Sequence, residues 1–466
     1  MGGVKYEYPQ TRKKILQVVP VLFGYLIGIS FGMMLGWSSH AYPFLMGDES
    51  PIPIRLNQTA LITSFLWKGN CLGAFFSTSK RLGAKHGVLL AATLELAGWF
   101  VMCCAGNLTE ILISRFLIGM GNGFGIGQLK IYIRDTCEQD IAAKLNTYLA
   151  LTSPIGILFT FVLSALVSFR TVSVVCTVFP FIALVLFGFI PKKPRYMENK
   201  RVAVIRNIID PVKTEKIMEV TKTYRHYTIE DQQLGVFEAL SDSSIRHSML
   251  IVTILVVVQR VSGGPPHIIF AELIYREAEN PYPQICVIVY GFVFLVMTTI
   301  SLQFTQRFSK KILLVSSFSI TSFLMMLMTL FFYYKNDVLQ LNRNFSWLPL
   351  VIALSFNVVH TFGIRTVSLL IIKDIFPANA KDFAGGVYIT VFSLSALLIT
   401  KSFQELYYHY GVHAGYVLMT SVAGASAVFI AIFYKQSLPE DESQKKDNGS
   451  NKDDKDKNVS IYITKF

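Results

Sequence analysis

Apolar residues fall into long runs separated by short polar stretches, and each run is about as long as a membrane-spanning helix. Roughly 20 apolar residues are needed to cross about 30 Å of hydrocarbon as an α-helix. A transmembrane β-barrel would instead show alternating segments of about ten residues. We therefore expect an all-α polytopic membrane protein. Its twelve predicted spans are residues 15–37, 58–79, 86–106, 111–132, 145–167, 172–190, 248–274, 284–304, 313–334, 347–372, 384–404 and 414–434.

One long hydrophilic stretch interrupts this pattern. Residues 191–247 are rich in Lys and Arg and contain no run apolar enough to cross a bilayer. The stretch divides the chain into a predicted N-terminal six-helix bundle, residues 1–190, and a C-terminal one, residues 248–434. The closing residues 435–466 are rich in Lys, Asp and Ser, which predicts a disordered tail.

Composition supports a membrane protein and gives its orientation. Of 466 residues, 52% are hydrophobic and 16% are charged, whereas soluble domains carry about 25% charged residues. The net charge of +13 does not indicate nucleic acid, because most of the 43 Lys and Arg residues lie in one alternate set of loops and tails. The positive-inside rule places that set in the cytoplasm. We expect cytoplasmic termini, a cytoplasmic central loop, and anionic lipid headgroups as secondary contacts.

No motif indicates catalysis. The six cysteines form no CxxC pair, and no nucleophile–base set, metal cluster or nucleotide loop is evident, so we expect neither an enzyme nor a cofactor or metal. The glycines at positions 119–127 lie in a predicted span with no preceding strand, so they predict helix packing and not a phosphate loop. Sequons at Asn57 and Asn344, in predicted outer loops, predict glycosylation.

Several stretches together resemble a known family. They are SRFLIGMGNGFG with IYIRD, PKKPRY at 191–196, QRVSG at 259–263, DIFP at 374–377, and TKSFQELYYHYGVHAGY at 400–416. In this order and spacing they resemble the sugar porter family of the major facilitator superfamily, and within it the insect facilitated trehalose or glucose transporters. The resemblance implies two six-helix bundles with a central cavity that opens alternately to the two sides of the membrane.

The resemblance also implies functional positions. For substrate binding it indicates Gln259, Arg260, Phe270 and Val367, and we add Arg365 because it too lies near the middle of a predicted span. A charge network at the gates is expected from Lys85, Arg115, Asp135, Lys310, Lys311, Asp374 and Lys381.

This chain departs from the family where the sugar would bind. Apolar or charged residues replace the family's polar or Trp side chains at Ala150, Arg260, Pro265, Phe294, Val367 and Phe392. Sugar hydroxyls need polar partners once they leave water. The departures therefore leave the identity of the cargo open.

Arg260 and Arg365 are expected about 18 Å and about 13 Å from the cytoplasmic ends of their spans, near mid-bilayer. A guanidinium there must face a cavity or find a partner. Three interpretations stay open: an anion-attracting site, a plugged cavity, or a structural ion pair. The candidate partners for such a pair are Glu95, Asp135, Glu272 and Asp374.

These patterns favour a monomeric facilitative solute carrier at the cell membrane that moves a trehalose- or glucose-like sugar by alternating access. Proton-coupled members of the family carry an acid in span one, and this chain has none there. The first alternative is an organic-anion carrier that uses Arg260 and Arg365. The second is a non-transporting receptor or sensor.

Overall fold

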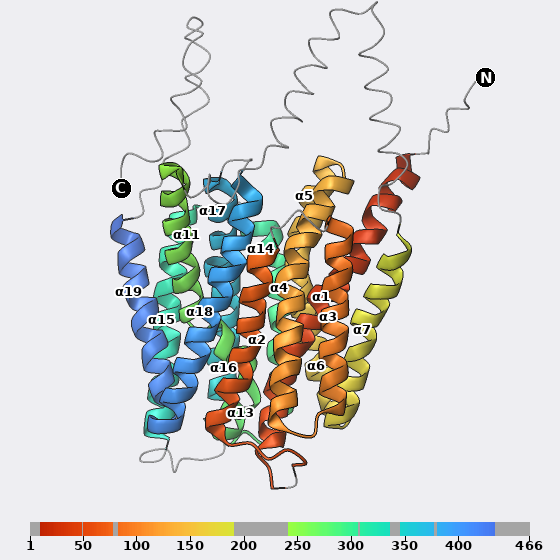
Figure 1. Ribbon diagram of the computed structural model, residues 1–466. Helices are drawn as coiled ribbons and strands as arrows, with labels where there is room; N and C mark the ends of the chain where they lie inside the picture. Colours follow the sequence, from red (N-terminus) through yellow and green to blue (C-terminus); the bar gives the residue numbers. More distant parts are fainter. Residues whose placement is uncertain are drawn as a thin grey trace, which may run out of the picture.

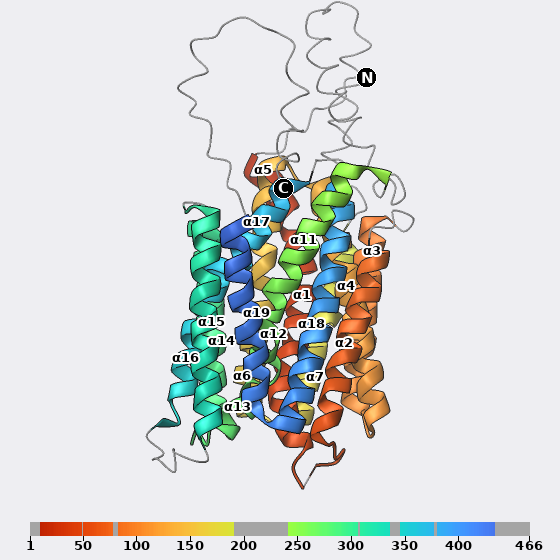
Figure 2. The same cartoon turned by 90° about the vertical axis from the view of Figure 1, so that its left-hand side faces the viewer.

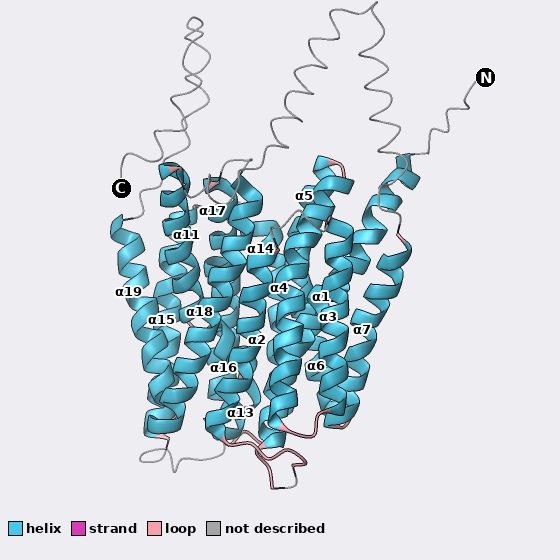
Figure 3. Cartoon of the chain, viewed as in Figure 1, coloured by secondary structure: helices cyan, strands magenta, loops and turns pink. Residues whose placement is uncertain are grey.

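The structure is a computed structural model, and it describes residues 10–48, 50–77, 83–190, 241–305, 308–335, 345–376 and 380–433. Within these ranges the chain is helical with short connections and no strand (Figure 3). The fold class predicted from the apolar runs is confirmed. Most of the central loop, the C-terminal tail and Asn344 lie outside the described residues.

Twelve helical rods can be followed through the described ranges. The six before the central loop are α1 (Gln10–Leu45), α2 (Leu56–Phe76), α3 (Ala84–Cys104), α4 (Leu108–Thr136), the composite of α5 (Gln139–Tyr148), η2 (Leu149–Leu151) and α6 (Thr152–Leu166), and α7 (Phe169–Phe189). The six after it are the composite of α11 (Ser243–Val261), α12 (Gly264–Ile269) and α13 (Ala271–Glu277), α14 (Pro283–Phe304), α15 (Lys310–Tyr334), the composite of α16 (Leu348–Val359), η5 (His360–Arg365) and α17 (Thr366–Ile375), α18 (Lys381–Tyr410), and α19 (Val412–Phe433).

Every predicted span overlaps one of these rods. By length and composition, ten helical segments among the described residues are apolar enough to cross a membrane. Helices α2 and α4 are not among those ten, and both carry Asn, Gln and Gly inside the rod. With these two helices, the described residues form twelve rods. Helices α2 and α4 pack closely against each other.

The rods stand side by side, and the two sets meet along well-defined seams (Figures 1 and 2). Helix α2 packs against α18, α6 packs against α14, and α1 meets α12 and α13. The first residues of α1 and the last residues of α19 lie at the upper end in Figure 1, whereas α13 lies near the lower end. The lower end is called the outer end below, following the orientation predicted from the basic loops.

Close backbone approach explains the glycines of α4. A Cβ atom at Gly123 would lie 2.1 Å from the carbonyl oxygen of Asn70 on α2, and one at Gly119 would lie 2.1 Å from that of Leu66. Small residues at a helix interface allow backbones to approach in this way. The glycine run is a packing face, as the sequence predicts.

Two rods of the C-terminal set are irregular near mid-length. The seventh breaks at Gly263, whose φ of +123° is accessible to glycine and strained for other residues. The tenth contains a π-helical segment from His360 to Arg365. Such bulges are rare and are frequently found at functional sites. Both irregularities adjoin the arginines that the sequence singles out.

Candidate functional site

Arg260 lies in the last turn of α11, three residues before the break at Gly263. Its guanidinium carbon lies 3.8 Å from the ring centre of Phe392 on α18 and 5.4 Å from that of Trp67 on α2. Its Nε atom is buried and has no hydrogen-bond partner among the described residues. The side chain therefore rests on aromatic rings from both halves of the molecule, with part of its hydrogen-bonding capacity unused.

Arg365 ends the π-helical segment and reaches across to the N-terminal set. Its Nη1 donates to Thr298 Oγ1 of α14 at 3.2 Å, and its Nη2 lies 3.5 Å from the carbonyl oxygen of Ala150 in η2. Its guanidinium carbon lies 5.0 Å from the ring centre of Phe294. All of these partners are neutral.

The two arginines belong to one site. They are close enough to interact electrostatically with each other and with Tyr388 of α18. No carboxylate pairs with either guanidinium among the described side chains. We refer to Arg260, Arg365 and Tyr388 as the arginine site.

Three of the proposed ion-pair partners lie elsewhere. Glu272 contacts His40 and Arg276, and Asp135 contacts Arg134 on the protein surface. Glu95 is fully buried among N-terminal helices, against Gly121. The side chain of Asp374 lies outside the described residues. The structure therefore offers no support for an ion pair to any of the first three.

Three of the positions that depart from the family pattern contact the two arginines. Phe392 lies under Arg260, Phe294 lies under Arg365, and the Ala150 carbonyl faces Arg365. Residues scattered along the sequence thus meet in space. Aromatic rings and guanidinium groups occupy the places where the family pattern has polar side chains.

The other expected substrate-binding residues divide into two groups. Gln259 adjoins Arg260, and its buried Oε1 has no hydrogen-bond partner among the described residues. Phe270 instead packs between Tyr42 and Phe403, at 5.8 and 5.7 Å between ring centres. Val367 is buried among apolar residues of the C-terminal set. The structure groups Gln259 with the arginines but does not group Phe270 or Val367 with them.

Two histidines support the irregular helices beside the site. His360 Nε2 donates to the Gln259 carbonyl at 3.2 Å, which satisfies an acceptor at the broken end of α11. His267 Nδ1 donates to the Gly263 carbonyl at 2.8 Å, and its ring stacks on Phe356 at 4.5 Å between centres. A carbonyl only accepts, so these bonds fix the protonated nitrogen of each ring. Both histidines hold the shape of the site.

Among the expected gate residues, Lys85 holds the end of a neighbouring helix. Lys85 donates to the carbonyls of Gly188, at 2.9 Å, and Ile190, at the end of α7. A cation suits a helix C-terminus. Lys310 and Lys311 begin α15, and the side chains of Asp374 and Lys381 lie outside the described residues. A gate role for this set stays a prediction.

Arg115 is fully buried inside the N-terminal set. It donates to the Met34 carbonyl at 3.1 Å and to Ser38 Oγ at 2.9 Å, and its guanidinium carbon lies 4.3 Å from the ring centre of Trp37. All three partners are neutral residues of α1. Among the described residues, Arg115 therefore has no acidic partner on the first span.

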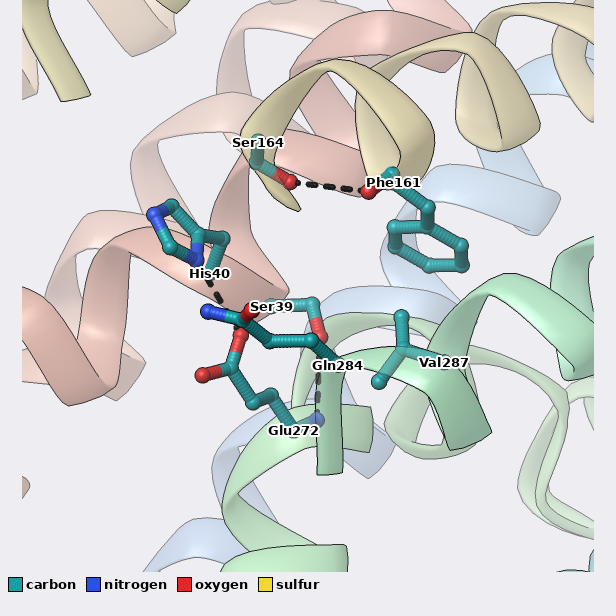
Figure 4. Close-up of a pocket in the computed structure, with 7 residues that line it drawn as sticks. All are labelled: Ser39, His40, Phe161, Ser164, Glu272, Gln284 and Val287. Carbon is teal, nitrogen blue, oxygen red and sulfur yellow. Dashed lines mark hydrogen bonds and ion pairs between the residues drawn. The ribbon is translucent and has the colours of Figure 1, made fainter. Parts of the chain in front are cut away.

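A polar contact joins the two halves at the outer end, and it was not predicted from the sequence. Glu272 Oε2 lies 3.2 Å from His40 Nδ1, and the Glu272 backbone N–H donates to Ser39 Oγ at 3.0 Å (Figure 4). Arg276 donates to Glu272 Oε1 at 2.8 Å. We call Ser39, His40, Glu272 and Arg276 the outer latch. The hollow beside it, lined also by Ser164 and Val287, has no room for a water molecule.

The sequence held a signal for this latch. Ser38, Ser39 and His40 follow the predicted end of the first span, yet α1 continues to Leu45 and buries both serines. Polar residues inside a helix that continues, opposite an acid in the seventh span, indicate a contact between the halves.

Comparison with known proteins gives a consistent result. The family described as "Sugar (and other) transporter" matches residues 15–440. The facilitated trehalose transporter Tret1 of Apis mellifera ligustica is 23% identical over 91% of this chain and 87% of its own length. Tret1 of Polypedilum vanderplanki is 23% identical over 94% of this chain and 89% of its own.

Solved structures share the fold. The inward-open xylose transporter XylE from E. coli superposes with a TM-score of 0.69 at 16% identity, covering 90% of this chain and 96% of that one. A partially occluded inward-open form of XylE gives 0.67 at 16% identity, covering 90% and 98%.

Proposed function

This chain belongs to the sugar porter family of the major facilitator superfamily, and we propose that it is a facilitative solute carrier working by alternating access. Its first expected cargo is a sugar such as trehalose, which the relatives' names mention, or glucose. The family assignment makes it a multi-pass membrane transporter and not an enzyme.

The observation that carries this proposal is the outer latch. It joins α1 of one half to α13 of the other, and the arginine site is also built by both halves, through Trp67 of α2 and Ala150 of η2. A carrier needs contacts between its halves that form in one state and break in another. Hydrogen bonds and a His–Glu contact at this interface are suited to that role. When the halves separate, each polar group can bond to water instead of to its partner, so breaking the contact costs little.

The buried arginine of α4 supports downhill transport. Arg115 meets a serine hydroxyl and a backbone carbonyl on α1, and neither group exchanges a proton near neutral pH. The first span therefore offers no carboxylate there to couple a proton to solute movement. Flux should follow the solute gradient alone.

The setting of the carrier is also proposed. Basic loops favour cytoplasmic termini, a location in the cell membrane, and contact with anionic headgroups on the inner face. We propose that the carrier acts as a monomer, because each chain contains both halves of the central site. The outer loops would carry glycans at Asn57 and Asn344.

Reconstitution into liposomes tests the proposal. Purified protein should give saturable uptake of labelled trehalose or glucose, and counterflow against preloaded sugar, with the same rate in the presence or absence of a pH gradient. Protein-free liposomes are the control. Uptake that requires the pH gradient would contradict facilitation. Specific binding without flux or counterflow would assign the chain to the non-transporting alternative.

A further inference from the structure

We propose that the arginine site binds an organic anion, with the carboxylate of the cargo held between Arg260 and Arg365 and its apolar body against the surrounding rings. The inference rests on the carrier function proposed above and concerns what is carried. It separates this chain from a carrier that handles only neutral, polyhydroxylated sugars.

The first argument is uncompensated charge. Two guanidiniums lie near each other inside the helical bundle, and the described side chains around them supply no negative charge. Aromatic faces and neutral acceptors offset only part of the cost of removing such cations from water. A bound anion would supply the missing charge.

The second argument is unused hydrogen-bonding capacity at the same place. The buried Nε of Arg260 donates to no described residue. The hydroxyl of Tyr388 has no hydrogen-bond partner among the described residues, and its side chain is partly accessible. Guanidiniums bind carboxylates through paired N–H donors in one plane. A carboxylate oxygen is therefore the group that these donors fit.

The third argument concerns the body of the cargo. Trp67, Phe294 and Phe392 surround the guanidiniums. Each ring centre lies 3.8–5.4 Å from a guanidinium carbon, and two of the rings replace polar residues of the family pattern. A sugar would lose hydration at several hydroxyls against these walls, whereas an aromatic or aliphatic carboxylate would gain apolar contact. The geometry points to a carboxylate with an apolar body.

The fourth argument is position. Arg260 and Arg365 come from the C-terminal set, and their contacts Trp67 and Ala150 come from the N-terminal set. An anion bound here would touch groups whose relative placement changes as the halves move. Transporter sites are commonly built at discontinuous helices near the midplane, and both arginines adjoin such irregularities.

The experiment compares matched probes on the full-length protein in liposomes. Benzoate and benzyl alcohol share a ring and differ by the charged group, and trehalose, gluconate and inorganic phosphate complete the panel. We expect saturable benzoate uptake that benzyl alcohol does not inhibit. Stronger uptake of gluconate than of benzoate would overturn the apolar-body assignment, and stronger uptake of phosphate would overturn the carboxylate.

Variants assign the effect to the site. Arg260→Gln and Arg365→Gln should each lower benzoate uptake at least tenfold, and Arg260→Lys should lower it less. Lys68→Gln is the matched control, because it also removes a cation from a span, but Lys68 is exposed beside Phe65 and away from the site. Equal effects of Arg260→Gln, Arg365→Gln and Lys68→Gln would overturn the proposal.

Two outcomes separate the inference from the carrier function. If trehalose or glucose is transported while benzoate is neither transported nor inhibitory, the anion site fails and the carrier stands. If no probe moves, the carrier function fails and takes the inference with it. The wild-type comparison of benzoate with benzyl alcohol decides the question even where a variant does not fold.

Discussion

His40 and Glu272 join the two halves of the molecule at its outer end, with 3.2 Å between Nδ1 and Oε2. His40 lies on α1, near the end of the first rod, and Glu272 lies on α13, beyond the break of the seventh. The Glu272 side chain is buried, and it also accepts a hydrogen bond from Arg276, one turn further along α13. One carboxylate therefore serves both the contact between the halves and the end of a broken helix.

Replacing that carboxylate should open the outer end. Glu272→Gln removes the charge, so the bonds from His40 and Arg276 lose roughly 1–3 kcal/mol in total, enough to shift a two-state equilibrium by roughly 5- to 150-fold. The measurement is the rate of thiol labelling from outside at Val287→Cys, beside the latch, after replacement of the six native cysteines. We expect faster labelling in the Glu272→Gln background.

The control for the latch is Glu405→Gln. Glu405 pairs with His409 one turn away on α18, and both side chains are exposed. This variant removes a carboxylate and a His–Glu contact without touching the seam, so labelling should be unchanged. Equal labelling rates in the Glu272→Gln and wild-type backgrounds would show that the latch does not hold the outer end closed.

The break in the seventh rod should depend on glycine. Gly263 has a φ of +123°, and a Cβ atom there would lie 3.0 Å from the sulfur of Met419. We expect Gly263→Ala to cost about 1–3 kcal/mol of strain and to reduce transport, because it displaces Arg260 and the His267 bond. Melting temperature in detergent and flux in liposomes measure the two effects. Gly385→Ala, with open space at its Cβ position, should leave stability equal or higher.

The sequence predicts the scaffold well because membranes impose strong local rules. Run length, loop charge and small-residue spacing are each readable without tertiary contacts, and all twelve predicted spans overlap helical rods. The end of the first span is the instructive difference. Ser39 and His40 resemble a membrane boundary in sequence, yet α1 continues through them because they meet Glu272 across the seam.

The site is harder to predict because its members come together only through packing. Sequence reasoning identifies Arg260 and Arg365 from their depth in the membrane, but not that both rest on rings at substituted positions. Position in the family pattern suggested Phe270 and Val367 as ligands, although one packs at the outer end and the other within the C-terminal set. Contacts between helices decide such assignments, and no local pattern contains them.

The predicted orientation can be tested through glycosylation. Asn57 is exposed in the first turn of α2, at the same end as the latch. Expressed in a glycosylating cell, the chain should lose apparent mass on treatment with a glycosidase, and Asn57→Gln should remove part of that shift. The control is Asn107→Gln, because Asn107 also begins an Asn-x-Thr sequon, but its side chain caps α4 by accepting from the Glu110 N–H, next to the membrane. An unchanged band for Asn57→Gln would argue against an outer location for the start of α2.

The close approach of α2 and α4 should not tolerate even one added methyl group. A Cβ atom at Gly123 would lie 2.1 Å from the Asn70 carbonyl oxygen and 2.7 Å from its Oδ1, which accepts a hydrogen bond from Asn122 at 3.1 Å. Gly123→Ala must therefore push the helices apart, and we expect it to destabilise the protein by about 1–3 kcal/mol. Gly188→Ala, where nothing lies within 4 Å of the new Cβ, is the matched control in the same half. Melting temperature in detergent should fall by several degrees for Gly123→Ala and stay level or rise for Gly188→Ala. Equal melting temperatures for the two variants would mean that α2 and α4 do not pack through this glycine face.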